Sequence, residues 1–546
     1  GTLTPGPLAL VSQSGQLATE IATIGARHGL GISRFVSIGN QSDVTAPELL
    51  ADLAGHDATR VVAVYLESFT GGEALFDALA MLRAAGKPTV LLTVGASAAS
   101  TRLARSHTGS LTSSLDIVDA ACRAAGVLRV NTPTQVVDVA RTLLTTSVAA
   151  GRRVVIVGDS GGQSAVAADL AASNALAVPQ LSESLTGVLA AALPAGAGCN
   201  NPVDLAGAGE KDLTAYATVI EQALASDEVD AAVLTGYFGC YGTDAPARAG
   251  EEVDVARRIG AIASDTGKPV LVHSMGSDSP AADVLWDSGV PVFGAIESAL
   301  GTLSGIARLG AYRPETVPVA AAAPVRPAPG YWAARELLTA NDIEVPPAVL
   351  VGNRADLDAA AGLNFPVVLK AGWLEHKSEV GGVVVGIAEP DQLAAAFDDM
   401  YGRLGAGDYV VEQQDTRSGV VEMLVGGRRD PDLGPVVVVG QGGTETEVHQ
   451  DVRLERAPVS PGTAAAMIAG LRCAPLLAGW RDRPAVDAEG LAELVAQVSQ
   501  LMAAHPDIAE IELNPVRVGP DAALPVDALV VTRTAETSTE GDENDH

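Results

Sequence analysis

The sequence predicts an α/β protein with two similar doubly wound parallel-sheet domains, followed by a domain of mixed α+β structure. Short apolar runs alternate with helical stretches up to residue 312, which is typical of parallel α/β sheets. The pattern of residues 1–148 recurs in residues 149–312, so this part contains two copies of one unit. Beyond residue 330, strands, Gly-rich turns and helices follow one another without that alternation.

Three apolar runs in the first copy predict buried strands, at residues 8–11, 61–66 and 88–92. The first run leads through Ser12-Gln13-Ser14-Gly15 into a stretch rich in Ala and Ile, which predicts a helix. The first copy therefore begins with a strand, a Gly-bearing turn and a helix.

The second copy begins in the same way. A run at residues 154–157 enters Gly158-Asp159-Ser160-Gly161-Gly162 and continues into an Ala-rich helical stretch. Residues 231–234 match the second strand of the first copy, and the sequence of residues 267–272 resembles that of residues 86–91. The repeat indicates a duplicated domain.

The chain after the duplication divides into a linker, a domain and a tail. Residues 313–330 are rich in Pro and Ala and predict a semi-rigid linker. The domain spans residues 331–533, and the polar, acidic residues 534–546 predict a disordered tail. Within the domain we expect a helix at residues 332–340 and strands at residues 365–370, 408–413 and 436–439.

Composition excludes several classes of function. The chain has 546 residues, and 35 Lys and Arg against 66 Asp and Glu give a net charge of −31, which argues against nucleic acid or an anionic membrane as a partner. The apolar runs are too short to predict a membrane span. Four scattered cysteines form no CxxC pair, so neither a disulfide framework nor a zinc site is expected, and a reducing cytoplasm fits best.

The two Gly-bearing turns are candidate phosphate sites. Ser14-Gly15 and Gly161-Gly162 each precede a helix, whose N-terminal N–H groups and positive dipole end attract an anion. Either turn alone is weak evidence, because most such turns are ordinary structural corners. Two such turns at matching positions of a duplication favour a phosphate clamp. The turns lack the GxGxxG pattern, so a dinucleotide cofactor is not expected.

A histidine in a polar loop is the candidate nucleophile. His107 lies in Ser106-His107-Thr108-Gly109, where neither neighbour is apolar, so the residue is either simply exposed or chemically active. Neutral imidazole can attack phosphorus and carry a phosphoryl group, and a carboxylate on its other nitrogen would fix the tautomer. Glu67 follows a predicted strand and is the candidate for that carboxylate, although it also fits an ordinary loop acid.

Two further clusters carry chemistry in the last domain. Lys370 ends a predicted strand, and Lys377 with Gly381-Gly382 follows, a combination suited to nucleotide phosphates but not to the P-loop pattern. The alternation Ile511-Glu512-Leu513-Asn514 points Glu512 and Asn514 to one face, and we expect Asp527 to join them from the next strand. Their oxygens suit Mg²⁺, although a solvated acidic strand gives the same pattern.

These motifs together resemble the NDP-forming acyl-CoA synthetases, the superfamily of succinyl-CoA synthetase and ADP-forming acetyl-CoA synthetase. The resemblance covers most of the chain in matching order. The motifs that carry it, in chain order, are Val11-Ser12-Gln13-Ser14-Gly15, Tyr65-Leu66-Glu67, Ser106-His107-Thr108-Gly109, Asn201-Pro202-Val203-Asp204, His376-Lys377-Ser378-Glu379-Val380-Gly381-Gly382-Val383, Gly440-Gln441-Gly442-Gly443 and Glu512-Leu513-Asn514-Pro515.

The resemblance implies two flavodoxin-like domains followed by an ATP-grasp domain, and a phosphorelay. Acyl-CoA and phosphate would give acyl phosphate, which would phosphorylate His107, with Glu67 steadying the phosphohistidine. His376 would pass the phosphoryl group to ADP. The implied nucleotide contacts are Lys370, Lys377, Gly381, Gly382 and Glu412 of the adenine-side hinge, with Glu512, Asn514 and Asp527 on Mg²⁺.

The chain departs from the family pattern in three places. The N-terminal CoA-binding domain of the family has no counterpart here, so we expect a separate CoA-binding subunit or a longer precursor. The hinge at residues 411–415 and the run at residues 443–447 are more polar than in relatives. The expected function is an acid–CoA ligase acting on a small carboxylic acid, CoA, nucleotide and phosphate, in an oligomer. The alternatives are a nucleotide- or acyl-CoA-sensing module without turnover and another ATP-grasp carboxylate ligase.

Overall fold

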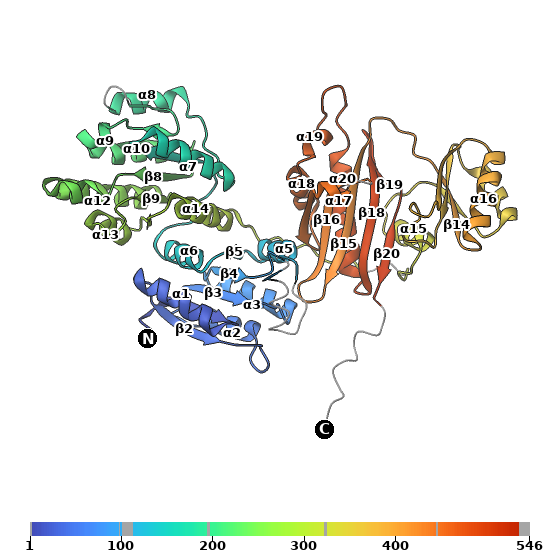
Figure 1. The fold of residues 1–546 in the computed structure, drawn as a ribbon, viewed down its shortest axis with the longest axis horizontal. Helices are drawn as coiled ribbons and strands as arrows, with labels where there is room; N and C mark the ends of the chain where they lie inside the picture. Colours follow the sequence, from blue (N-terminus) through green and yellow to red (C-terminus); the bar gives the residue numbers. More distant parts are fainter. Residues whose placement is uncertain are drawn as a thin grey trace. The chain divides into compact units, whose positions relative to one another are not determined.

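The computed structural model describes residues 3–533, except residues 98, 101–112, 194–196, 322–324 and 444–445. The chain forms two compact units (Figure 1). The first unit consists of Gly1–Thr112 and Ala125–Pro314, and the second of Ser113–Ala124 and Glu315–His546. No helix in the described ranges is long and apolar enough to cross a membrane.

The first parallel sheet has the strand order β2-β1-β3-β4-β5. Its strands are β1 (Pro5–Ser12), β2 (Ile32–Ser37), β3 (Val61–Leu66), β4 (Thr89–Thr93) and β5 (Leu128–Val130). Helices α1 (Gly15–Arg27) and α6 (Pro133–Thr145) pack together, as do α2 (Ala46–Ala54) and α3 (Gly72–Ala84). The predicted strand at residues 61–66 is confirmed, and every residue of β3 is buried, as expected of a strand covered by helices.

The second sheet repeats this topology. Its strands are β6 (Val154–Gly158), β7 (Val203–Asp204), β8 (Ala231–Gly236), β9 (Val270–Ser274) and β10 (Val292–Phe293), in the order β10-β9-β8-β6-β7. Read from the other edge, the order is the same 2-1-3-4-5 permutation, which is the flavodoxin-like arrangement. The predicted duplication is therefore confirmed at the level of strand order.

Helices cover the second sheet as well. The helices of this domain are α7 (Gly161–Ser173), α8 (Glu183–Ala192), α9 (Ala208–Lys211), α10 (Thr214–Leu224), α11 (Tyr241–Asp244), η1 (Pro246–Arg248), α12 (Ala249–Thr266), α13 (Pro280–Asp287) and α14 (Ile296–Ala311). Helix α7 packs against α14, while α10 packs against α8 and α12. Ligands of such sheets bind at the carboxyl ends of the strands, where the loops gather.

The second unit is built on two antiparallel sheets (Figure 1). The four-stranded sheet has the order β11-β14-β12-β13, and the larger sheet has the order β17-β16-β15-β18-β19, with β20 paired to β18. The elements are α5 (Leu115–Ala125), α15 (Tyr331–Ala340), β11 (Ala348–Val351), η2 (Arg354–Gly362), β12 (Val367–Ala371), β13 (Val383–Ile387), α16 (Pro390–Leu404), β14 (Tyr409–Gln413), β15 (Val421–Asp430), β16 (Gly434–Gln441), α17 (Thr446–His449), β17 (Val452–Arg456), α18 (Pro461–Ala469), α19 (Ala474–Leu477), α20 (Ala488–Ala504), β18 (Ile508–Val518), β19 (Ala523–Pro525) and β20 (Leu529–Thr532).

Helices pack on both sheets of the second unit. Helix α16 contacts β12 and β13, and α20 contacts β15 and β16 of the larger sheet. The described residues between α14 and α15 form neither helix nor strand, in accord with the linker expected there. The tail at residues 534–546 lies outside the described residues.

Candidate functional site

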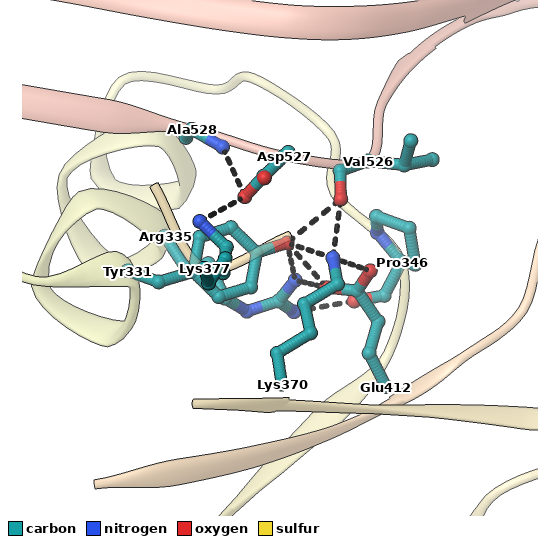
Figure 2. A network of polar contacts seen from close by, with 9 residues as sticks. All are labelled: Tyr331, Arg335, Pro346, Lys370, Lys377, Glu412, Val526, Asp527 and Ala528. Atoms are coloured by element: carbon teal, nitrogen blue, oxygen red, sulfur yellow. Dashed lines mark hydrogen bonds and ion pairs between the residues drawn. The ribbon is translucent and has the colours of Figure 1, made fainter. Parts of the chain in front are cut away.

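Lys370 lies at the centre of a buried polar network in the second unit (Figure 2). Strands β12 and β14 are antiparallel, and Val368 is paired with Glu412 while Lys370 is paired with Val410. Lys370 and Glu412 are thus diagonal neighbours on one face of the sheet, within reach of each other. The Lys370 Nζ donates to Glu412 Oε1 at 2.7 Å, to the Tyr331 hydroxyl at 3.0 Å and to the Val526 carbonyl.

Glu412 holds a second cation in this network. The Arg335 guanidinium, which also donates to the Pro346 carbonyl, forms an ion pair with Glu412 Oε2. Tyr331 donates to the same Glu412 oxygen at 2.6 Å. Lys370, Arg335 and Glu412 are 5%, 7% and 1% exposed, so the two cations and their carboxylate are nearly shielded from water.

Burial and neighbouring charge both shift proton affinities in this network. Burial raises the pKa of the Tyr331 hydroxyl to about 12. Burial alone would lower the pKa of Lys370, but Tyr331 and the Glu412 carboxylate outweigh it and raise the pKa above its ordinary value. Lys370 therefore stays charged, and its three ammonium hydrogens already have protein acceptors. A nucleotide phosphate would have to displace one of them to reach Lys370.

A second cluster surrounds a cavity of about 200 Å³ in the same unit. Five of the residues singled out from the sequence line it: His376, Lys377, Glu512, Asn514 and Asp527. The Lys377 Nζ lies 2.9 Å from Asp527 Oδ1, and Lys377 is buried while His376 is exposed. These five residues bring a cation, an imidazole and three oxygen-bearing side chains to the cavity, whose lining also includes Glu375, Ser378 and Glu379.

The three expected metal ligands come from one strand and one loop. Glu512 and Asn514 lie two residues apart on β18, whose buried residues alternate with partly exposed ones, as the sequence predicted. Asp527 lies in the connection between β19 and β20, so its predicted placement on a strand is wrong. The Asn514 Nδ2 is 3.2 Å from Glu512 Oε1, and Asn514 Oδ1 accepts from the Gly443 N–H at 3.0 Å.

The donor set fits a hard cation. Two carboxylates and an amide oxygen are ligands that Mg²⁺ prefers, with waters completing its shell. Within the described ranges, no group of three or more His, Cys, Asp and Glu residues is arranged around a common metal position, so Asn514 is needed to complete the set. A bound cation would share Asp527 with Lys377.

The Gly381-Gly382 turn closes tightly on Lys377. Gly381 has φ +66°, a conformation that favours glycine. The Gly382 N–H donates to the Lys377 carbonyl at 2.6 Å, and a Cβ on Gly382 would lie 2.8 Å from that oxygen. The glycines therefore allow the backbone to fold back beside the buried lysine.

The first unit brings Glu67 and the start of α1 together. Ser14 caps α1 by accepting from the Leu17 N–H at 3.3 Å, and Gly15 begins the helix. The preceding Gln13 side chain accepts from the N–H groups of Glu67, at 2.5 Å, and Ser68, at 3.0 Å. Glu67 therefore lies at the carboxyl edge of the sheet beside the predicted phosphate turn.

Helix α7 begins at Gly161, at the matching position of the second sheet. A Cβ added to Gly161 would lie 3.0 Å from Asp204 Oδ2, so the Asn201-Pro202-Val203-Asp204 motif ends against this turn. Gly161 and Gly162 are both exposed. Convergence of the α1 and α7 turns on one phosphate stays a prediction, and His107 lies outside the described residues.

Sequence reasoning missed Tyr331, Arg335 and the Val526 carbonyl, which surround Lys370. The assignment of Glu412 to the adenine-side hinge stays a prediction, and sequence reasoning did not foresee that its carboxylate contacts Lys370 and Arg335. The available signal was an acidic residue ending the apolar run Tyr409-Val410-Val411, since a charge there needs a buried partner.

Three family models match the chain in order: a succinyl-CoA ligase-like flavodoxin domain at residues 5–143, a Ligase-CoA domain at residues 154–313 and an ATP-grasp domain at residues 325–532. A trans-feruloyl-CoA synthase of an unknown prokaryote is 30% identical over 96% of this chain and 76% of its own length. The chain belongs to the NDP-forming acyl-CoA synthetase family. It is therefore an enzyme, an ADP-forming acid–CoA ligase.

Other members of the family differ in how their chains are divided. An ADP-forming acetate–CoA ligase of Archaeoglobus fulgidus is 29% identical over 96% of this chain and 78% of its own length. In Pyrococcus furiosus, a related acetate–CoA ligase has separate subunits. Its alpha subunit is 31% identical over 55% of this chain and 64% of its own length. Its beta subunit is 32% identical over 36% of this chain and 89% of its own length. The family thus includes both fused and divided chains.

Proposed function

We propose that this acid–CoA ligase works through a phosphohistidine relay with His107 as the acceptor. In the direction of ATP synthesis, phosphate displaces CoA from acyl-CoA and forms acyl phosphate. His107 then takes the phosphoryl group and releases the acid, and ADP finally accepts that group as ATP. The proximity of Glu67 to the α1 turn supports its role beside the phosphohistidine.

The nucleotide end of the relay belongs in the cavity at His376. The observation that carries this assignment is the convergence of His376, Lys377, Glu512, Asn514 and Asp527 on one cavity. Lys377 and the Gly381-Gly382 turn would hold nucleotide phosphates. Lys370 would also bind a phosphate once that phosphate replaces one of the three protein acceptors of its ammonium group. Glu512, Asn514 and Asp527 would hold Mg²⁺, which offsets phosphate charge when bound. His376, exposed at the cavity, would pass the phosphoryl group.

The substrates follow from the family. They are an adenine nucleotide, CoA, phosphate and an organic acid, and the printed names of relatives range from acetate to ferulate. We propose that a CoA-binding domain or subunit completes the enzyme, that the assembly is oligomeric and that it acts in the cytoplasm. The scattered cysteines suit that reducing compartment.

Neither alternative function has a specific observation in its favour. Another ATP-grasp carboxylate ligase would not explain the two flavodoxin-like sheets of the first unit. A sensing module would have no chemical reason to combine His107 with Glu67. Turnover through a covalent phosphohistidine therefore separates the proposed function from both.

Labelled ATP with Mg²⁺ tests the relay on the full chain. We expect an acid-labile, base-stable phosphoprotein, because a phosphoramidate resists base and hydrolyses in acid. His107→Ala should abolish the label. His28→Ala, which removes an exposed imidazole at the end of α1, should retain it. Full labelling of His107→Ala would refute the assignment, and an unlabelled parent protein would favour a sensing module.

A further inference from the structure

A second cavity, of about 640 Å³, opens at the carboxyl edge of the second parallel sheet. Asp159 and Ser160 follow β6, Tyr237 follows β8 and Met275 follows β9, and all four line it. Small-molecule sites in open α/β sheets gather at this edge. Ser160 directly precedes Gly161, where the relay is expected to present phosphate, so the cavity adjoins the proposed acyl-transfer site.

Aromatic side chains are concentrated at this cavity. The chain is only 3% aromatic, yet Tyr237 and Tyr241 both line the cavity, with ring centroids 5.0 Å apart in an edge-to-face arrangement. Tyr216 packs behind them at 5.3 Å from Phe238. Met275, whose side chain is largely exposed, also lines the cavity and offers a polarisable thioether. The lining therefore favours a planar ring over a short aliphatic group.

The charged side chains of the lining determine which polar groups of a ligand are favoured there. The Tyr241 hydroxyl donates to Asp159 Oδ2 at 2.6 Å, and the Tyr237 hydroxyl donates to Asp244. With Glu210, three carboxylates line the cavity against the single cation of Arg248. Such a lining repels carboxylates, so the start of α7, with its N–H groups, is the favourable place for the one carboxylate of an acid, while the rest of the lining accepts hydrogen bonds from hydroxyl donors.

Hydrogen bonds from neighbouring elements hold the loop that carries Tyr237 and Tyr241 in place. Glu252 of α12 is 2% exposed, and its carboxylate accepts from the N–H groups of Gly239 at 2.6 Å, Tyr241 at 3.2 Å and Gly242 at 2.9 Å. Ser274 donates to the Phe238 carbonyl at 2.5 Å. The aromatic wall is therefore preformed, which reduces the ordering cost of binding.

We propose that this cavity binds the acid substrate, and that the substrate is an aromatic monocarboxylic acid carrying a hydroxyl group on its ring. The ring lies between the Tyr237–Tyr241 pair and Met275, the hydroxyl donates to Asp244, and the carboxylate faces the start of α7. This assignment rests on the proposed function, because it takes the acid to react at that helix start.

Calorimetric titration of the full chain tests the assignment with four probes: 4-hydroxycinnamate, cinnamate, acetate and succinate. We expect 4-hydroxycinnamate to bind at least tenfold more tightly than cinnamate, and acetate and succinate more weakly still. Met275→Trp, which fills the cavity from an exposed position, should weaken 4-hydroxycinnamate binding at least tenfold. Met81→Trp, an exposed methionine on α3, is the matched control and should leave it unchanged. Asp244→Asn should reduce the preference for the hydroxylated acid.

Two outcomes would overturn the assignment: no binding of 4-hydroxycinnamate, or equal binding by the parent chain and Met275→Trp. A preference for acetate or succinate would do the same. Labelling from ATP is measured on the same protein. Labelling without the expected acid preference refutes the acid pocket alone, whereas loss of labelling in the parent chain refutes the relay.

Discussion

At the scale of single residues, Glu412 has the most demanding position in the second unit. One carboxylate forms ion pairs with both Lys370 and Arg335, and each of the three residues is at most 7% exposed. Charges removed from water require partners, so the network is stable only as a complete set. Tyr331 and the Val526 carbonyl complete the coordination of Lys370. Glu412 thus fixes Lys370 at the end of β12, whatever else the lysine binds.

Glu412→Gln tests this role. The amide keeps the shape but leaves two buried cations without a counter-charge, so we expect a loss of about 3–5 kcal/mol in the free energy of unfolding. Urea unfolding followed by tryptophan fluorescence measures it. Glu336→Gln is the control, because Glu336 is exposed and accepts a hydrogen bond from Trp332 Nε1 at 3.0 Å. A change in Glu412→Gln below about 1 kcal/mol would contradict the account.

Sequence reasoning identified the residues of the His376 cavity but not the partners of Lys370. Glu512 and Asn514 share a face through the two-residue period of a strand, so their proximity follows from spacing alone. The approach of Glu412 to Lys370 depends on the register of β12 against β14, which no local pattern reveals. Tyr331 enters from α15, a helix remote in sequence from both strands.

At the scale of elements, Asp415 ties the end of β14 to β18. Its carboxylate accepts from the Arg417 Nε at 2.9 Å and from the Arg517 Nε, on β18, at 3.0 Å. Burial alone would raise the pKa of Asp415, but the hydrogen bonds from Arg417 and Arg517 outweigh it and lower the pKa to about 2. The two sheets of the second unit are thus linked through one ionised carboxylate.

The stabilisation from Asp415 depends on pH. A pKa lowered from about 3.9 in the unfolded chain means that the contribution is complete above about pH 4 and declines as pH falls toward about 2. Asp415→Asn should cost about 1–3 kcal/mol at pH 7, and this difference from the parent should narrow below pH 4. Urea midpoints at pH 7, 5 and 3 measure the difference. Asp482→Asn is the control, because Asp482 is exposed, and it should unfold at the same urea concentration as the parent at each pH. A stability difference between the parent and Asp415→Asn that grows as pH falls would refute the assignment.

At the scale of the whole molecule, the duplication was predictable and the division into units was not. Both parallel sheets follow from repeated strand, glycine and helix patterns, which act over short stretches of sequence. Residues 113–124 lie within the first predicted domain but pack with the second unit. Ser113 donates to Asp430 at 2.9 Å, and Arg123 pairs with Glu455 at 2.6 Å. These contacts join residues more than 300 positions apart, so no sequence period indicates them.

The packing of residues 113–124 with the second unit predicts how the chain behaves when it is cleaved between the units. A protease site inserted after Pro314, in the exposed linker, would leave residues 113–124 on the N-terminal fragment although they pack with the C-terminal one. Because Ile117 and Val118 of α5 are at most 2% exposed, apolar burial should hold the fragments together after cleavage, and they should co-elute in size-exclusion chromatography at micromolar concentration.

Ile117→Asp combined with Arg123→Ser should separate the two fragments, because the double variant buries a charge and removes the ion pair with Glu455. Arg257→Ser, which breaks an exposed ion pair on α12, should not. If the two fragments of the cleaved parent chain eluted separately, α5 would not be what holds the N-terminal fragment to the second unit.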